Sequence, residues 1–196
     1  MKKSKYTEIW ATPIGEYWLE DMSIHEEIKY LINTVKWNGD DTMHLLKEPS
    51  KFGDWVKECV TDYVSKFNYP MKSCEIKRAW CTVQHPFHDN FIHTHYSVDV
   101  AAVYYVETIP EHPSLEILDP RPAHNFNMVH RRMADNNIAS GFSSIQIPHE
   151  KHKLIIHPGY LQHGVTHNLT NVPRSSVAMN IVTQRDYSVK NITSSY

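Results

Sequence analysis

Two histidines separated by one residue, His93 and His95, are the residues of this sequence most suited to chemistry. In a β-strand, side chains two residues apart project from the same face, about 7 Å from one another. Two imidazoles on one face can therefore converge on a single metal ion. Because a metal ion needs further ligands, the pair predicts that a third protein ligand comes from another part of the chain.

His163 is the predicted third ligand. An apolar run at residues 154–156 leads into His157-Pro158-Gly159, and His163 opens the segment that follows this turn. A jelly roll brings residues from distant strands to one open end. His93, His95 and His163 would then form a facial set of three ligands with open positions for a substrate and for oxygen. The chain has 14 histidines, and a lone one is usually a surface or core residue, so the prediction depends on the combination.

Arg174 follows His163 by eleven residues, and Ser176 lies two positions further on. On a strand these two side chains share one face. A guanidinium binds a carboxylate through two parallel hydrogen bonds, and a hydroxyl adds a third. In isolation Arg174 would be read as an ordinary surface charge. Its place after the predicted metal ligand makes it a candidate anchor for a metal-bound 2-oxo acid.

Two helices and a series of short strands must position these residues. Apolar residues from Ile24 to Val35 recur at helical spacing after a capping-box pattern at Ser23 and Glu26, and a second such face follows Ser50 as N-cap. Residues 9–18 predict a short edge strand interrupted by Pro13. Eight further strands are predicted at residues 75–84, 91–95, 98–107, 115–118, 143–147, 153–157, 163–166 and 175–183. The irregular stretch 120–141 is predicted to be a loop or lid.

This order of elements predicts a mainly β fold, a double-stranded β-helix or jelly roll with two helices against one sheet. We expect a single domain over residues 1–196, with helical support in 1–72 and the jelly-roll core in 73–186. The formal charge of −2 and the lack of a long Lys/Arg cluster argue against nucleic acid and anionic membrane surfaces as partners. Three cysteines, an odd number without metal-ligand spacing, and the lack of a secretory or membrane-spanning segment predict a cytoplasmic protein.

The sequence also resembles a known family of enzymes. His93-x-His95, Tyr104-Tyr105, Leu118 to Arg121, Pro158 to Val165, and Arg174-x-Ser176 with Asn180 are together similar to a family of 2-oxoglutarate/Fe(II)-dependent oxygenases of bacteria and their phages, related to the prolyl-hydroxylase-like enzymes. The resemblance covers residues 76–183. It implies a double-stranded β-helix, Fe(II), and 2-oxoglutarate as co-substrate.

The resemblance also implies roles for individual residues. His93, His95 and His163 would take the metal positions, Arg174 and Ser176 would bind the distal carboxylate of 2-oxoglutarate, and Tyr104 or Tyr105 would line its pocket. The broader superfamily has an aspartate where this chain has His95. Asp99 is the alternative ligand, although on a regular strand it would lie about 13 Å from His95 and would need a bulge to reach the metal.

An oxygenase of this kind is expected to use O2, to hydroxylate an unidentified prime substrate, and to release succinate and CO2. A protein side chain such as proline and a small metabolite both fit, and the sequence does not choose between them. His124, His130, Arg131 and Arg132 could contact this substrate or belong to a solvated loop. The sequence leaves the oligomeric state open, with a homodimer as one option.

Two other functions fit the same residues. His93-x-His95 followed by Asp99 is similar to the cupin pattern, which predicts a cupin-type metal protein, either an oxygenase that works without 2-oxoglutarate or a small-ligand binder. Arg174 and Ser176 distinguish the two readings, because cupins do not require them. A protein that keeps the fold without catalysis is the third reading.

Overall fold

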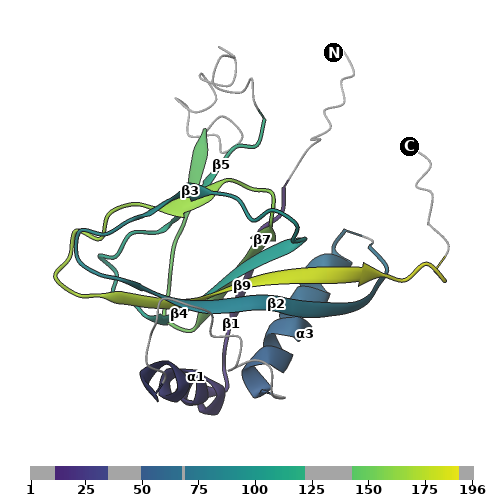
Figure 1. Cartoon of the computed structure of the whole chain (residues 1–196), viewed down its shortest axis with the longest axis horizontal. Coiled ribbons are helices and arrows are strands. Elements are labelled where there is room, and N and C mark those ends of the chain that lie inside the picture. The colour runs from purple at the N-terminus through teal and green to yellow at the C-terminus, as the bar shows by residue number, and fades with distance from the viewer. Residues whose placement is uncertain (1–11, 35–49, 68, 122–142, 190–196) are drawn as a thin grey trace, which may run out of the picture.

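The computed structural model describes residues 12–34, 50–67, 69–121 and 143–189. Its elements in chain order are β1 (Gly15–Trp18), α1 (Met22–Thr34), α3 (Lys51–Ser65), β2 (Met71–Gln84), β3 (Asn90–His93), β4 (Val100–Glu107), β5 (Leu115–Leu118), β6 (Ser144–Ile147), β7 (Lys153–Pro158), β8 (His163–Val165) and β9 (Arg174–Arg185). Figure 1 shows long strands at the centre of the molecule and short strands above them.

The strands form two antiparallel sheets. The larger has five strands in the order β1-β7-β4-β9-β2, and the smaller has four in the order β3-β8-β5-β6. Neighbours in a sheet are far apart in sequence, because β7 pairs with both β1 and β4, and β9 pairs with both β4 and β2. This two-sheet arrangement with N-terminal helices is the mainly β jelly roll that the sequence predicts.

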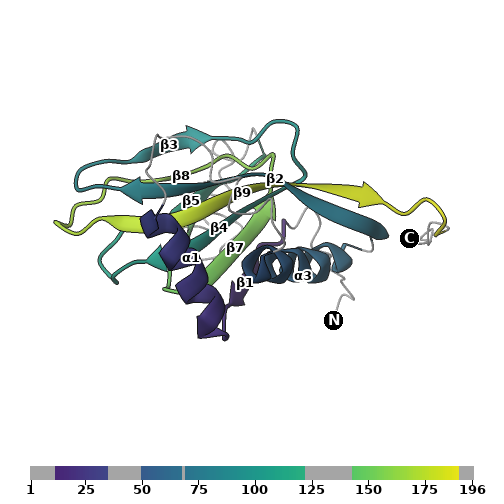
Figure 2. The ribbon, with the colours of Figure 1, turned by 60° about the horizontal axis from the view of Figure 1, so that its bottom comes forward.

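Both helices cover the outer face of the five-stranded sheet, opposite the smaller sheet (Figure 2). Helix α3 begins as predicted, because Ser50 Oγ accepts a hydrogen bond of 2.9 Å from Gly53 N. Helix α1 begins at Met22, so its N-cap lies two residues before Ser23, the cap that the sequence predicts. Asp21 Oδ1 accepts from Ser23 N at 2.9 Å, so the cap is Asp21 and not Ser23.

Alternation along the strands separates two apolar cores. Val100, Ala102 and Tyr104 of β4 face the helices and belong to a large core with the buried faces of α1 and α3. Tyr105 faces the other way, toward the smaller sheet, and packs in a second core with Leu115, Ile117, Ile155, Leu161 and Val165. Of the two predicted tyrosines, only Tyr105 lies in this second layer, between the two sheets.

The predicted strands agree with those observed to within a few residues. The main difference concerns the segment that carries the first two histidines, because β3 ends at His93 and leaves His95 outside the strand. Residues 9–11, Val35 and most of the predicted lid fall outside the described residues. Among the described residues, no helix has the length and apolar character needed to span a membrane.

Candidate metal centre

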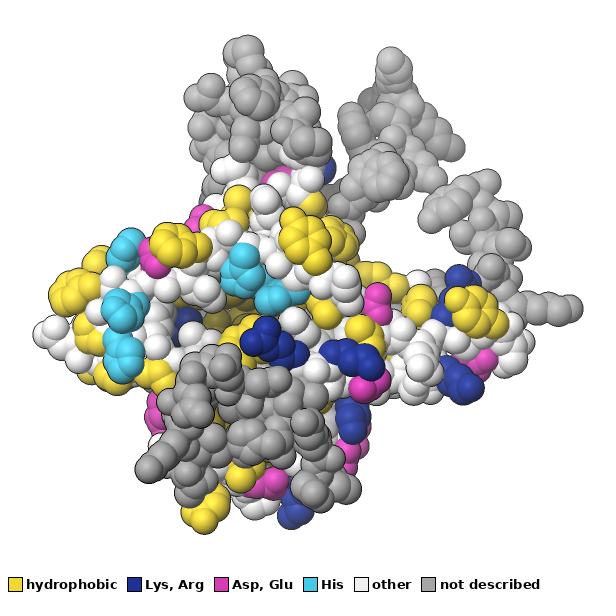
Figure 3. All heavy atoms as spheres, viewed as in Figure 1, with side chains coloured by type: hydrophobic (Ala, Val, Ile, Leu, Met, Phe, Trp, Pro, Cys, Tyr) yellow, Lys and Arg dark blue, Asp and Glu magenta, His cyan; other side chains and the backbone are white. Residues whose placement is uncertain are grey.

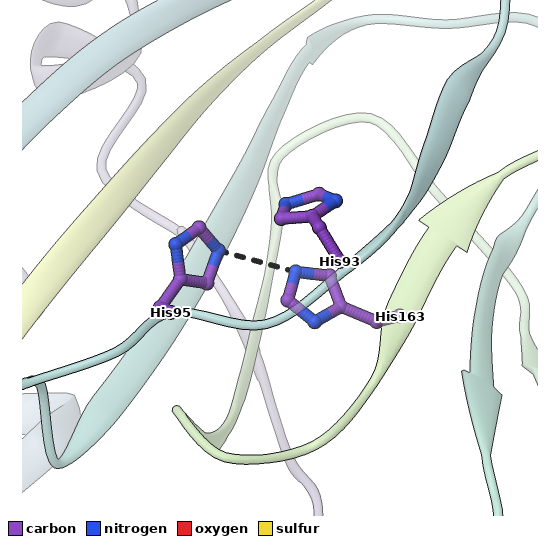
Figure 4. A group of neighbouring side chains, drawn as sticks. All are labelled: His93, His95 and His163. Atoms are coloured by element: carbon purple, nitrogen blue, oxygen red, sulfur yellow. Dashed lines mark hydrogen bonds between the residues drawn. The ribbon is translucent and has the colours of Figure 1, made fainter.

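Three imidazoles converge between the ends of β3 and β8. One ring nitrogen from each of His93, His95 and His163 lies within 4.8 Å of those of the other two. Figure 4 shows the three rings turned toward a common point from β3, from the segment after β3, and from β8. His95 Nε2 and His163 Nε2 are 3.2 Å apart. Two nitrogens bound at right angles to one metal at about 2.1 Å lie about 3.0 Å apart, so this spacing fits a shared ion.

Backbone carbonyls fix the orientation of two of these rings. His163 Nδ1 donates to Leu161 O at 2.9 Å, and His93 Nδ1 donates to Phe91 O at 2.6 Å. With the proton on Nδ1, the Nε2 atom of a neutral imidazole carries its lone pair. Metal-binding histidines are commonly held in this way by a hydrogen bond from the other ring nitrogen.

Burial lowers the pKa of two of the three imidazoles, those of His95 and His163. The pKa of His95 and the pKa of His163 are each lowered to about 4, mainly because burial penalises the charged form. For His95 the neighbouring His163, His93 and Arg78 lower it further. A metal therefore meets lone pairs and not imidazolium groups at neutral pH.

Hydrogen bonds also position the segment from residue 95 to 99. His95 N donates to Gly159 O at 3.0 Å, and Gly159 N donates to Asp99 O at 3.0 Å. A Cβ atom on Gly159 would lie 2.5 Å from Val98 O, so only glycine allows this close approach. The turn after β7, which the sequence suggested as the link to His163, thus also holds the second histidine.

Asp99, the alternative ligand, is directed elsewhere. Its Oδ2 accepts hydrogen bonds from Thr183 N at 2.6 Å and from Thr183 Oγ1 at 3.0 Å. Asp99 is exposed and is not part of the histidine cluster. Ser97, which precedes it by two residues, has φ 66°, so the chain turns here and does not form the bulge that would bring this carboxylate to the centre.

Two further aromatic side chains adjoin the cluster, and sequence reasoning gave them no role. The buried ring of His157 lies 4.4 Å from that of His163, and its Nδ1 donates to Pro158 O. Burial and His163 lower the pKa of His157 to about 3, so it stays neutral behind the cluster. The Trp80 ring lies 5.8 Å from that of His95. Only the alternation of β2 and β7 could have pointed to these residues.

Arg174 is buried between the two sheets beside Tyr105, and one of its N–H groups has no hydrogen-bond partner among the described residues. It is 3% exposed, its Nη1 donates to Pro113 O at 2.8 Å, and its buried Nε has no partner among the described residues. Its Cζ lies 5.4 Å from the centre of the Tyr105 ring, and the buried Tyr105 hydroxyl also has no partner there. Buried polar atoms without a hydrogen-bond partner reduce the stability of the fold. A carboxylate bound here would accept hydrogen bonds from both groups.

Ser176 and the two tyrosines are divided between the faces of the sheet. Ser176 is 2% exposed and pairs with Tyr105 across β9 and β4. Tyr104 points to the opposite face, where its hydroxyl lies 3.0 Å from His25 Nδ1. The structure therefore brings Arg174, Ser176 and Tyr105 together and places Tyr104 with the helices. Period-two alternation already required that only one of the two tyrosines face the site.

A hollow opens between the two sheets on the face seen in Figure 3, with histidine side chains at its rim and basic side chains beside and within it. A sequence profile described as "Putative 2OG-Fe(II) oxygenase" matches residues 78–180. This match includes all of the predicted site residues.

The chain belongs to this family. It is therefore a 2-oxoglutarate/Fe(II)-dependent oxygenase, as the sequence resemblance implied, with Fe(II) as cofactor and 2-oxoglutarate as co-substrate. No curated protein matches the oxygenase by sequence.

Solved structures support the fold. HygX from Streptomyces hygroscopicus with nickel, 2-oxoglutarate and hygromycin B bound is 14% identical, with a TM-score of 0.59, over 87% of this chain and 83% of that one. EctD from S. alaskensis in its apoform is 12% identical, with a TM-score of 0.55, over 86% and 72%. A Pseudomonas putida prolyl-4-hydroxylase is 9% identical, with a TM-score of 0.53, over 91% and 89%. At these identities the similarity concerns the double-stranded β-helix alone.

The donor atoms of this oxygenase suit the two groups that its family requires. Imidazole is a good ligand for iron, and three imidazole rings converge on one point. Arg174 and Tyr105 direct unpartnered polar atoms into the same layer. The residues present therefore fit a metal ion with a carboxylic acid beside it.

Proposed function

We propose that this oxygenase binds Fe(II) through His93, His95 and His163 and hydroxylates a prime substrate at the mouth of the hollow. The observation that supports this proposal best is the convergence of the three ring nitrogens within 4.8 Å in the layer that also holds Arg174. Bound there, Fe(II) supplies the oxidative chemistry by which 2-oxoglutarate and O2 become succinate and CO2 while one oxygen atom enters a C–H bond of the substrate.

Arg174 and Ser176 hold the distal carboxylate of 2-oxoglutarate in this proposal. The guanidinium has the charge and the free Nε, and the hydroxyl of Ser176 lies on the same face two residues away. The hydroxyl of Tyr105 donates a further hydrogen bond. Tyr104 is left out of this set because it bonds His25 on the other face.

The protein also excludes water from the co-substrate and orients the imidazoles before metal binds. Tyr105, Leu161 and Val165 are buried in the core beside the predicted pocket, so the carbon chain of the co-substrate would meet apolar walls. Neutral, pre-oriented imidazoles need little rearrangement when metal binds. The protein thus fixes geometry and access, while the cofactor carries the oxidation.

The prime substrate is a protein side chain such as proline or a small metabolite. HygX has been solved with hygromycin B, and the Pseudomonas putida protein is a prolyl-4-hydroxylase, so this fold serves both substrate classes. A cupin-type metal protein that works without 2-oxoglutarate is the alternative. The buried and partly unpartnered Arg174 favours the oxygenase, because a cupin would have no use for it.

Succinate formation from 2-oxoglutarate tests this proposal. With Fe(II) and O2 present, the wild type should form succinate slowly even before a prime substrate is found. Arg174→Ala should lose the thermal stabilisation given by 2-oxoglutarate and keep that given by the metal. His163→Ala should lose bound iron, whereas His88→Ala, which changes an exposed histidine, should retain it.

Two results would contradict the proposal. If neither Fe(II) nor 2-oxoglutarate raised the melting temperature of the wild type, the oxygenase site would have to lie elsewhere. If His163→Ala kept one full equivalent of iron, the ligand set would be wrong.

A further inference from the structure

The side of the metal centre that faces away from Arg174 carries a second basic group, Arg78. It is an exposed residue of β2 whose Cζ lies 5.3 Å from the centre of the Trp80 ring. The Trp80 ring in turn lies 5.8 Å from that of His95. A guanidinium stacked on an aromatic face is held in place and still directs its N–H groups outward.

Arg78 has no anionic partner among the residues that the structure describes. Neighbouring charges on β2 are paired with each other, since Lys77 Nζ lies 2.6 Å from Glu75 Oε2. Asp99, on the segment between His95 and β4, accepts from Thr183. Within these described residues, the positive charge beside His95 is therefore uncompensated.

Register places Arg78 beyond the reach of the co-substrate anchored at Arg174. In the pairing of β2 with β9, Thr82 lies opposite Ser176 and Arg78 lies opposite Asn180. Four residues of strand separate these two pairs by about 13 Å, whereas the terminal carbons of a five-carbon diacid lie roughly 5 Å apart. A molecule bound at Arg78 would lie on the other side of the metal from Ser176, where the prime substrate must enter.

The charge of the ligand set strengthens this reasoning. Three neutral imidazoles add no negative charge to a divalent ion, whereas the aspartate of the broader superfamily would add one. With 2-oxoglutarate balancing the ion and Arg174 charged, the loaded site keeps a net positive charge even before Arg78 is counted. A site of this kind attracts an anion and disfavours a cation.

We propose that Arg78, stacked on Trp80, binds an anionic group of the prime substrate, a carboxylate or a phosphate monoester, and so selects negatively charged substrates. This inference rests on the proposed function, because it takes His95 as a metal ligand and Arg174 as the co-substrate anchor. Trp80 would be the platform that holds the guanidinium, and the C–H bond to be hydroxylated would lie between Arg78 and the metal.

Saturation-transfer NMR with simple probes tests the inference without turnover. The protein is loaded with Zn(II), as a diamagnetic substitute for Fe(II), and with 2-oxoglutarate, and then titrated with phenylacetate, phenyl phosphate and the neutral phenylacetamide. At least one anion should bind, and the amide should bind at least tenfold more weakly. The stronger of the two anions identifies the anionic group as carboxylate or phosphate.

Variants then assign the binding to Arg78. Arg78→Gln should weaken anion binding at least tenfold and leave 2-oxoglutarate affinity unchanged. Arg78→Lys should retain part of the anion affinity that Arg78→Gln loses. Lys77→Gln removes the same charge from the adjacent position and should have no effect. Equal binding of amide and anions, anion binding that survives in Arg78→Gln, or a loss of 2-oxoglutarate affinity in that variant would overturn the inference.

The two proposals fail in different ways. A wild type that takes up neither metal nor 2-oxoglutarate refutes the proposed function, and the inference with it. A wild type that takes up both but does not prefer the anions refutes the inference alone.

Discussion

At the scale of single residues, the histidine cluster of this oxygenase includes no carboxylate from the part of the chain that the structure describes. His95 fills the position at which the broader superfamily has an aspartate, and it lies in the cluster although β3 has already ended. Asp99 cannot replace it while Thr183 holds its Oδ2. In the proposed ligand set, the backbone turn at Ser97 therefore determines that His95 and not Asp99 faces the cluster.

Substitution of His95 and of Asp99 should show which of the two side chains binds the metal. His95→Ala should weaken metal binding by more than about 100-fold, because even partners outside the ligand set commonly account for 10- to 100-fold. Asp99→Asn should change metal affinity little, because this carboxylate bonds Thr183 and not the cluster. Isothermal titration with Fe(II) under anaerobic conditions measures both. The reverse outcome would make Asp99 the ligand and would require the segment 95–99 to refold.

The adjacent tyrosines offer a second matched pair. Tyr105→Phe removes a buried hydroxyl that has no partner, so the ligand-free protein should become more stable by about 1 kcal/mol while 2-oxoglutarate binds less tightly. Tyr104→Phe removes a hydroxyl that bonds His25, so it should destabilise the protein and leave 2-oxoglutarate affinity unchanged. Denaturant unfolding and thermal shift with 2-oxoglutarate measure the two effects. A Tyr105→Phe variant with unchanged affinity would place the co-substrate elsewhere.

Residue types and spacing were enough to predict the three histidines, Arg174 and Ser176 as a group that the fold brings into one layer. The sequence could not assign the two tyrosines, because the face that each presents depends on which sheet face the helices cover. It also could not reveal Arg78 or His157, because their places depend on tertiary structure: strand register sets Arg78 opposite Asn180, and the packing of the two sheets brings the His157 ring to 4.4 Å from that of His163.

At the scale of elements, the turn after β7 positions two of the three histidines of the candidate metal centre. Gly159 bonds His95 through its carbonyl oxygen and Asp99 through its N–H, while His163 follows at the start of β8. Two of the three histidines thus depend on one turn. The sequence predicted this turn from Pro158-Gly159, but its contact with the segment after β3 is a tertiary contact that local pattern does not encode.

Gly159→Ala should therefore damage metal binding without touching a ligand. The added Cβ would lie 2.5 Å from the backbone oxygen of Val98, which forces the segment carrying His95 to move. We expect at least a tenfold loss of metal affinity. Tyr160→Ala, in the same turn but with a side chain 61% exposed, is the control and should bind metal normally. Equal affinity of both variants would show that the turn does not position His95.

Helix α1 is joined to the sheet by a buried histidine whose protonation should matter for stability. His25 is 2% exposed, and its ring lies 4.1 Å from that of His152. Burial, followed by the charges of His152 and Lys151, lowers the pKa of His25, although Glu26 and Glu107 oppose this. The folded state therefore binds a proton at this site less readily than the unfolded chain.

It follows that the free energy of unfolding should fall as the pH drops below about 6.5, the ordinary pKa of histidine. Above that pH both states are neutral at His25 and the effect disappears. His25→Gln should reduce the slope between pH 7 and pH 5, measured by urea unfolding. His88→Gln, which alters an exposed histidine, should leave the slope as in the wild type. An unchanged slope in His25→Gln would assign the pH dependence to other groups.

At the scale of the whole molecule, the two sheets differ in strand length and in the size of the core that packs against them. The five-stranded sheet contains strands of 14 and 12 residues and shares a large core with both helices. Strands β3 and β8 of the smaller sheet have only four and three residues, and their pairing is irregular between Asn90 and His93. The predicted division into a helical support and a jelly-roll core stays a prediction, as do the cytoplasmic location and a homodimer.

A metal held by His93, His95 and His163 would join β3 to β8 and to the segment directly after β3, so its removal should loosen only one part of the molecule. Hydrogen exchange measured by mass spectrometry, with Fe(II) and then with a chelator, should show faster exchange in residues 90–99 and 163–165. Peptides from α3 should exchange at the same rate in both states, because this helix packs in the large core, to which none of the three histidines belongs. The matched variant is His163→Ala, which should show the faster exchange whether or not metal is present. A chelator effect spread evenly over both sheets would mean that the metal stabilises the fold as a whole, and that the smaller sheet is no less stable than the larger one.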